Sequence, residues 1–295
     1  MSDAPSLSKM EIRTGRIIDE NTIILLFEMS AAAQRDIPHT GIGIWRRFRD
    51  WKKMRLDYNG IDVTKDPGPS GSEPSFVIIG NTGKYTGVLD GSSVSGIIVH
   101  EGALASADVI RGSVMAVGII GGVYRMKDPH TWEQLSKPLV TANLEAVCEY
   151  PSGGFLVCGW DGLVAHYDGA SVEQLESGTN VILTDIICDD GGEIFACGQR
   201  GIILRGLKGA LRPLHLEGII EDFWSIAKFQ GDVYVSSITA LYKLIDNENL
   251  ELVQFDGEEI PTSFYRLDSY EDSLLLSVGQ KDAVLFDGKA WTRIL

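Results

Sequence analysis

The sequence predicts an all-β protein: a seven-bladed β-propeller of four-stranded antiparallel blades, with few or no helices. A short element, in which an apolar strand ends near a glycine and a tight turn leads into a second strand, recurs seven times. Its copies begin at residues 41, 80, 118, 159, 198, 237 and 279, so neighbouring copies lie 38 to 42 residues apart. A repeat of about forty residues in a pattern of short strands is typical of propellers, with one blade per repeat. No segment shows a long 3.6-residue period, which argues against helices.

The fourth repeat shows best how one blade is built. We expect its four strands at residues 144–150, 155–158, 163–167 and 171–175. Asp168-Gly169 lies between the last two, and this dipeptide is typical of a two-residue hairpin because both positions need a positive φ. Large apolar residues such as Trp132 and Trp291 begin the outer strands of other repeats. We expect these side chains to be buried between blades, where each contributes about 1.5–3 kcal/mol.

The same order of elements continues along the chain. The turn is clearest at residues 159–162 and 198–201, and weakest at 41–44 and 237–240. Seven blades of about forty residues use nearly the whole chain, which predicts one domain over residues 1–295. Because the first blade starts at the N-terminus and the last one reaches the C-terminus, we expect the terminal blades to close the ring by packing, without a shared strand.

Two stretches interrupt the repeat. Residues 30–40 lengthen the turn between the second and third strands of the first blade, and residues 59–75 precede the second strand of the second blade. The latter stretch includes a shortened first strand near Ile61-Asp62-Val63 and a run rich in Pro, Gly and Ser after Asp66. Such a run stays on the surface because it cannot bury enough apolar area to fold alone. Loops of this length are either functional or mobile, and both alternatives stay open.

The chain is acidic, since 26 Lys and Arg against 41 Asp and Glu give a net charge of −15. This charge argues against a nucleic-acid partner. It would attract a basic protein, although it also fits simple solvation of the surface. No run approaches the roughly 18 apolar residues that cross a membrane, and residues 1–6 lack the basic and apolar regions of a secretory signal. We therefore expect a cytoplasmic protein that does not bind membranes.

Four cysteines occupy equivalent places in consecutive repeats: Cys148 and Cys188 lie 40 residues apart, and Cys158 and Cys197 lie 39 apart. Cys158 and Cys197 immediately precede the turn glycine, and we expect them to be buried thiols that behave as small apolar side chains. The close Cys-x-x-Cys pairs of zinc sites are absent, so no metal or cofactor is predicted. The sequence also lacks Gly-x-Ser-x-Gly, His-Glu-x-x-His and phosphate-loop motifs. It therefore predicts no catalytic residue and a protein that is not an enzyme.

Residues 159–186 carry a specific order: Gly-x-x-Gly, two apolar residues, Asp-Gly, an outer strand, Ser-Gly-Thr and Leu-x-x-Ile. This order resembles the bacterial WD40/YVTN/BNR-like repeats, which implies a propeller fold. The Gly-His and Trp-Asp markers of true WD40 repeats are missing, and so is the Asp-box of sialidases, which argues against glycosidase activity. Members of this broad class include assembly factors, sensor domains and immunity proteins encoded beside secreted bacterial toxins.

One face of the predicted propeller is the candidate binding surface, because the turns between second and third strands and the links between blades emerge there. The candidate partner-binding residues on that face are Asn81, Trp160, Asp161, Gln199, Arg200, Lys281, Glu221, Asp222, Trp224 and, in the second insertion, Asp66. Trp160 stands out because no other repeat has an aromatic residue at its position. An exposed tryptophan is typical of a binding hot spot. The alternative is an indole folded over the rim to cover apolar surface.

The leading hypothesis is a non-catalytic cytoplasmic protein that binds another, basic protein through this face. Within that class the resemblance implies an immunity protein, of the kind paired with a toxin, that covers the toxin's active site. A rival hypothesis is a propeller enzyme or small-ligand sensor, whose central channel would present Asp185, Glu145, Ser225 and Arg266. A third is a scaffold subunit of a larger assembly.

Overall fold

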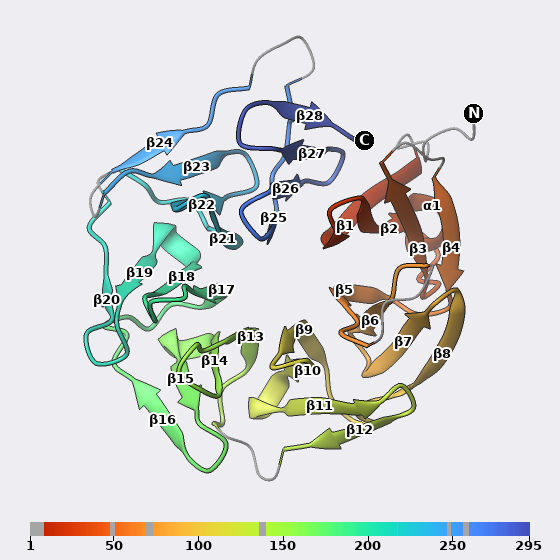
Figure 1. Ribbon diagram of the computed structural model, residues 1–295, viewed down its shortest axis with the longest axis horizontal. Helices are drawn as coiled ribbons and strands as arrows, with labels where there is room; N and C mark the ends of the chain where they lie inside the picture. The colour runs from red at the N-terminus through yellow and green to blue at the C-terminus, as the bar shows by residue number, and fades with distance from the viewer. Residues whose placement is uncertain are drawn as a thin grey trace.

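A computed structural model describes residues 9–47, 51–68, 73–135, 140–216, 218–246, 249–255 and 260–295. In these residues, 28 strands pair into seven four-stranded antiparallel sheets. The sheets stand around a central axis, each built from one consecutive stretch of chain (Figure 1). The molecule is a seven-bladed β-propeller, and the predicted fold class is confirmed.

The first strand of every blade lies nearest the axis and the fourth lies at the rim (Figure 1). Blade one consists of β1 (Met10–Asp19), β2 (Thr22–Met29), β3 (Thr40–Arg46) and β4 (Lys52–Leu56). Blade two consists of β5 (Gly60–Lys65), β6 (Phe76–Gly80), β7 (Lys84–Leu89) and β8 (Ser92–Ile97). Blade three consists of β9 (Leu104–Ile110), β10 (Ser113–Gly118), β11 (Val123–Asp128) and β12 (Thr131–Gln134).

The later blades follow the same order. Blade four consists of β13 (Leu144–Glu149), β14 (Phe155–Gly159), β15 (Val164–Tyr167) and β16 (Val172–Leu175). Blade five consists of β17 (Leu183–Cys188), β18 (Ile194–Gly198), β19 (Ile203–Gly206) and β20 (Arg212–Pro213). Blade six consists of β21 (Ser225–Phe229), β22 (Asp232–Ser236), β23 (Leu241–Leu244) and β24 (Leu250–Leu252). Blade seven consists of β25 (Arg266–Tyr270), β26 (Leu274–Val278), β27 (Ala283–Phe286) and β28 (Trp291–Arg293).

The second strands are mainly apolar because both of their faces are covered by neighbouring blades. Every residue of β6, β14 and β18 is buried. Apolar clusters fill the spaces between consecutive blades; Cys158 of blade four, for example, packs with Ile194 of blade five. Cys148, Cys158 and Cys197 are buried free thiols, and burial raises their pKa well above the usual range. The predicted role of Cys158 and Cys197 as small apolar side chains is confirmed.

Blades one and seven close the ring without sharing a strand, as predicted. An apolar cluster joins them, with Leu25 of β2 and Leu276 of β26 at its centre. Asp268 accepts a hydrogen bond from the backbone N–H of Ile17 across the seam, at 2.6 Å. Lys281 donates from Nζ to the carbonyl oxygen of Met10 at 2.6 Å. The seam is therefore held by packing and a few charged contacts between the two ends of the chain.

The propeller has two distinct faces because its strands alternate in direction. The face that carries the turns between second and third strands and the links between blades is called the link face. The face that carries the other turns, within each hairpin of first and second or third and fourth strands, is called the hairpin face. Three of the link-face turns are short 3-10 helices: η2 (Ile119–Gly121), η3 (Trp160–Gly162) and η4 (Gln199–Gly201). The link face is the one that the sequence predicted as a binding surface.

Two sequence-based placements are wrong. The first insertion does lie between β2 and β3, and includes the short helix α1 (Ser30–Ala33). The residues expected as the turn of blade one, 41–44, instead lie inside β3 and pair with β2. The second insertion joins β5 to β6, so it lies on the hairpin face, and the first strand before it is a full six residues. Residues 69–72 of that insertion and residues 1–8 lie outside the described residues.

Candidate functional site

The recurring turn holds its second residue outward in a fixed conformation. Ile120, Asp161 and Arg200 occupy this position with φ of 54°, 59° and 59°. The backbone N–H of Ile120 donates to Asn143 Oδ1 at 3.0 Å, and that of Arg200 donates to Asp222 Oδ1 at 2.9 Å. Side chains of the links therefore cap the turns, and the turns are preformed elements of the link face.

Trp160 is only partly covered, and its indole is held in place. Its side chain is 43% exposed, and its Nε1–H donates to Glu145 Oε1 at 2.7 Å. Burial raises the pKa of the Glu145 carboxyl, while the bond from Trp160 opposes that shift. The sequence analysis assigned Trp160 to a protein-binding surface, whereas it assigned Glu145 to the central channel of the rival hypothesis. The structure brings them together as one unit.

Most of the other predicted residues lie on the link face. Asn81, Asp161, Arg200 and Asp222 are exposed there, and Gln199 is half-buried. Glu221 is on the same face, where it accepts hydrogen bonds from the hydroxyls of Tyr242 and Thr239.

Three predicted residues have structural roles instead. Asp66 is buried at the hairpin face, where its carboxylate accepts the N–H of Gly68 at 2.7 Å, so its placement on the binding face is wrong. Lys281 is on the link face, but its ammonium group is bonded across the ring seam. Trp224 is half-buried, and its ring packs against that of Tyr265 with 5.1 Å between centroids.

A depression of about 610 Å³ opens at the centre of the link face. We call it the axial mouth; side chains of blades one to four and seven line it. Its aromatic and charged lining residues are Trp160, Tyr265, Phe27, Glu145, Arg13, Glu28 and His39. Arg13 is paired with Glu28. His39 accepts the N–H of Met29 at Nε2 (2.6 Å) and donates from Nδ1 to the carbonyl of Ile37 (2.7 Å), so its ring is bonded to backbone on both sides.

Exposed apolar side chains gather on the link face, which sequence reasoning missed. Those in its turns and links are Ile37, Ile119, Ile120, Trp160, Ile220, Ile238, Ile260 and Tyr265. Only Leu207 and Ile245 are comparably exposed in the described turns of the hairpin face. Ile120 is 63% exposed, and a β-branched residue with positive φ is a true outlier. The available signal was the pair of isoleucines inside the glycine-rich turn, because the equivalent positions 81–82, 199–200 and 280–281 are polar.

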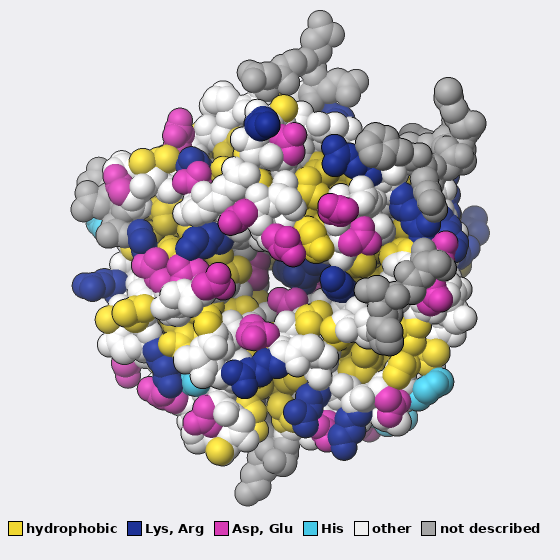
Figure 2. Space-filling model, viewed as in Figure 1, with side chains coloured by type: hydrophobic (Ala, Val, Ile, Leu, Met, Phe, Trp, Pro, Cys, Tyr) yellow, Lys and Arg dark blue, Asp and Glu magenta, His cyan; other side chains and the backbone are white. Residues whose placement is uncertain are grey.

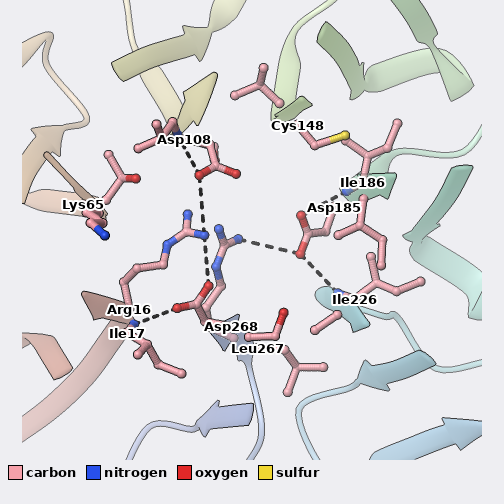
Figure 3. A pocket seen from close by; sticks show the side chains of 18 residues that line it. Arg16, Ile17, Lys65, Asp108, Cys148, Asp185, Ile186, Ile226, Leu267 and Asp268 are labelled. Atoms are coloured by element: carbon pink, nitrogen blue, oxygen red, sulfur yellow. Dashed lines mark hydrogen bonds and ion pairs between the residues drawn. The ribbon is translucent and has the colours of Figure 1, made fainter. Parts of the chain in front are cut away.

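Beneath the mouth, charged side chains fill the channel in a group that we call the channel layer. It consists of Arg16, Arg266, Asp62, Asp108, Asp185 and Asp268. Figure 3 labels Arg16, Asp108, Asp185 and Asp268 of this group. Four carboxylates against two guanidinium groups give the layer a formal charge of 2 − 4 = −2. Viewed along the axis, acidic and basic side chains surround the central opening (Figure 2). Burial raises the pKa of Asp268 to about 6, and the Arg16 charge opposes this shift.

The layer ties neighbouring blades together. Asp185 of blade five accepts from the hydroxyl of Ser225 at 2.6 Å and from the N–H of Ile226 at 3.1 Å, both in blade six. Asp62 accepts equivalent bonds from blade three, and Asp268 accepts from blade one. Asp185, Ser225 and Arg266, which the rival hypothesis placed in the channel, are therefore close together. Asp185 is hydrogen-bonded to Ser225, so a ligand would have to displace that bond. Arg266 makes only ion contacts, at 3.9 Å to Asp185 and 3.7 Å to Asp62, and its buried Nε has no hydrogen-bond partner among the described residues.

No group of three or more His, Cys, Asp or Glu side chains in the described ranges is arranged to hold a metal ion. None of the helices found there is long and apolar enough to cross a membrane.

The chain is similar in sequence to a protein named immune protein Tsi7, from Pseudomonas aeruginosa. The two are 39% identical over 203 residues, which cover 66% of this chain and 65% of that protein. The chain thus matches just under two thirds of the relative's length. No family model matches the chain.

Solved structures share the fold across nearly the whole chain. A streptogramin B lyase has a TM-score of 0.74 at 8% identity, covering 98% of this chain and 100% of its own. The WD40 β-propeller domain of Doa1 has a TM-score of 0.72 at 13% identity, covering 95% and 94%. YCF48 bound to a D1 peptide has a TM-score of 0.65 at 17% identity, covering 94% and 93%. Lyases and peptide binders thus share one architecture, so function must be argued from the site.

Proposed function

We propose that this chain is a non-catalytic immunity protein that binds a toxin protein through the link face and neutralises it by covering the toxin's active site. The similarity to immune protein Tsi7 carries the proposal. The exposed apolar side chains of the link face support it independently, because large apolar side chains concentrated on one face are typical of an interaction site. We place this activity in the cytoplasm.

The arrangement of the face suits a protein partner. Its turns are capped by link side chains, so little ordering is needed when a partner binds. Trp160 and Ile120 project from neighbouring turns, η3 and η2, and large preordered side chains of this kind supply most of the energy in protein interfaces. The net charge of −15 would steer a basic toxin towards the chain and speed its association.

A binding experiment with matched variants tests the proposal. The chain would be purified and mixed with the product of the neighbouring gene, and affinity measured by calorimetry. We expect Trp160→Ala or Ile120→Ser to weaken binding about 10- to 100-fold, as truncation of a hot spot does. Leu207→Ser on the hairpin face is the control, since it removes an equally exposed aliphatic side chain, and it should leave affinity unchanged.

Three other outcomes would point elsewhere. Recovery of several proteins together would favour a scaffold subunit. Loss of binding in the Leu207 control but not in the link-face variants would place the interface on the hairpin face. A rise of several degrees in the thermal midpoint with one small ligand, and no protein partner, would favour the channel hypothesis, because a ligand of the native state stabilises it.

A further inference from the structure

The axial mouth has the chemistry of a pocket for a positively charged side chain. Its volume, about 610 Å³, exceeds what one long side chain needs and leaves room for the tip of a loop. Trp160 and Tyr265 both line it, and they are 43% and 39% exposed. Aromatic faces attract Lys and Arg groups through the negative face of the ring.

Both aromatic side chains are held in place before anything binds. The indole of Trp160 is anchored by its bond to Glu145, and the ring of Tyr265 rests on Trp224. Groups that are already ordered lose little conformational entropy when a ligand arrives, so their contacts add fully to affinity.

The charges that face the mouth favour a cation. Arg13 is matched by Glu28, which leaves Glu145 as the lining carboxylate without a cationic partner among the contacts of the described residues. One oxygen of Glu145 accepts from Trp160, while no bond of Oε2 is found in the described chain. Below the mouth, the channel layer adds a formal charge of −2. An anion would be repelled, and a purely apolar side chain would leave the Glu145 carboxylate buried without a counter-ion.

The rim of the mouth adds apolar contact around this charged centre. Ile119 lines the mouth and Ile120 follows it on the same turn. Ile120 has the same left-handed backbone as Asp161 and Arg200 in the equivalent turns, and its N–H is capped by Asn143, so the turn itself requires this conformation. Its exposed side chain adds apolar surface beside the mouth.

We propose that the axial mouth receives a single lysine or arginine side chain from a loop of the partner protein, with Trp160 and Tyr265 as aromatic walls and Glu145 as the counter-ion. The inference rests on the proposed function, because it presumes a protein partner at the link face. The partner is then expected to have a protruding basic residue. Apolar side chains around that residue would contact Ile119 and Ile120.

A test with short peptides needs no identified toxin. Tetra-arginine, tetra-lysine and the neutral isostere tetra-citrulline would be titrated into the full chain while tryptophan fluorescence is followed. We expect saturable changes with the two cationic peptides that weaken as salt is added, since salt screens the attraction. The change should disappear in Trp160→Phe, which identifies the tryptophan that reports it.

Glu145→Gln is the decisive variant, because Gln still offers an oxygen to the Trp160 indole and only the charge is lost. It should weaken binding of the arginine peptide about tenfold or more, as expected for loss of a charged hydrogen-bond partner. Glu176→Gln is the control, since it makes the same charge change in an exposed link outside the mouth. It should bind as the wild type does. Equal thermal midpoints of the two variants would show that folding is unaffected.

The outcomes separate this inference from the proposed function. Equal binding of tetra-citrulline, or no effect of Glu145→Gln, overturns the cation pocket. If the toxin still binds and Trp160→Ala weakens it while Glu145→Gln does not, the immunity function stands and the pocket inference is wrong. If the peptides behave as expected but no toxin binds, the proposed function fails while the pocket remains.

Discussion

The seam between blades one and seven is where the chain's two ends meet, and Asp268→Ala should weaken it. The substitution removes the acceptor of the Ile17 N–H, which lies at 2.6 Å in the intact protein. It also removes the nearest carboxylate of Arg16, at 3.2 Å. Arg16 keeps Asp62 and Asp108 at 3.8 and 4.0 Å, and its guanidinium still donates to backbone carbonyls. Loss of the acceptor for the backbone N–H of Ile17 is therefore the larger effect, and the weaker pairing of Arg16 is the smaller one.

The two effects on charge nearly cancel. Loss of one carboxylate weakens the pairing of Arg16, but it also reduces repulsion within a layer of net charge −2. A buried amide without an acceptor costs about 1–3 kcal/mol. We therefore expect Asp268→Ala to lower the free energy of unfolding by about 2–3 kcal/mol, a large part of the 5–15 kcal/mol typical of a folded protein.

Urea unfolding at pH 7 measures this change, with hydrogen exchange at the Ile17 amide as the local reading. Asp268→Asn separates the two explanations, since its amide oxygen can still accept the Ile17 N–H. It should cost only about 1 kcal/mol. Asp232→Ala is the control, because it removes an exposed ion pair with Lys243, worth less than about 1 kcal/mol. A loss below 1 kcal/mol in Asp268→Ala, or an equal loss in Asp268→Asn, would refute the reasoning.

Three further predictions follow from the same structure. Burial raises the native pKa of Asp268 to about 6, above its unfolded value, so the native state takes up a proton as pH falls. Its stability relative to Asp268→Asn should therefore increase from pH 7 to pH 5 by about 1 kcal/mol. Equal pH dependence of the two unfolding midpoints would contradict this. Ile120→Gly removes the steric cost of a positive φ at an exposed position, so it should stabilise the fold by about 0.5–1 kcal/mol. The same change should weaken toxin binding, because the exposed side chain is lost. A lower thermal midpoint with unchanged affinity would contradict both expectations. Gly121→Ala should destabilise the chain by roughly 2 kcal/mol or more. The new Cβ would lie 1.7 Å from the carbonyl oxygen of Val140, on a residue with a φ of +63°. An unchanged midpoint in thermal unfolding would show that the link carrying Val140 can move aside.

The candidate site could be predicted only in outline. The turns that carry Trp160 and Arg200 are local, and their repeat placed both residues on the link face correctly. The bonding of Lys281 to Met10 joins residues at opposite ends of the chain. The contact of Trp160 with Glu145 links a turn to the first strand of its blade. Neither contact has a signature in the repeat, because both depend on where separate segments meet in space.

The sequence by itself determined the number of blades, the order of strands within them and the burial of Cys158 and Cys197. These features follow from local periodicity, since glycine turns and apolar strands of forty-residue spacing specify a blade without reference to the rest of the chain. Only the tertiary structure decided which face the insertion after Asp66 occupies, which charges neutralise one another in the channel, and where the exposed isoleucines gather. Those features depend on strand direction and on contacts between blades, and the ring must close before any of them exists.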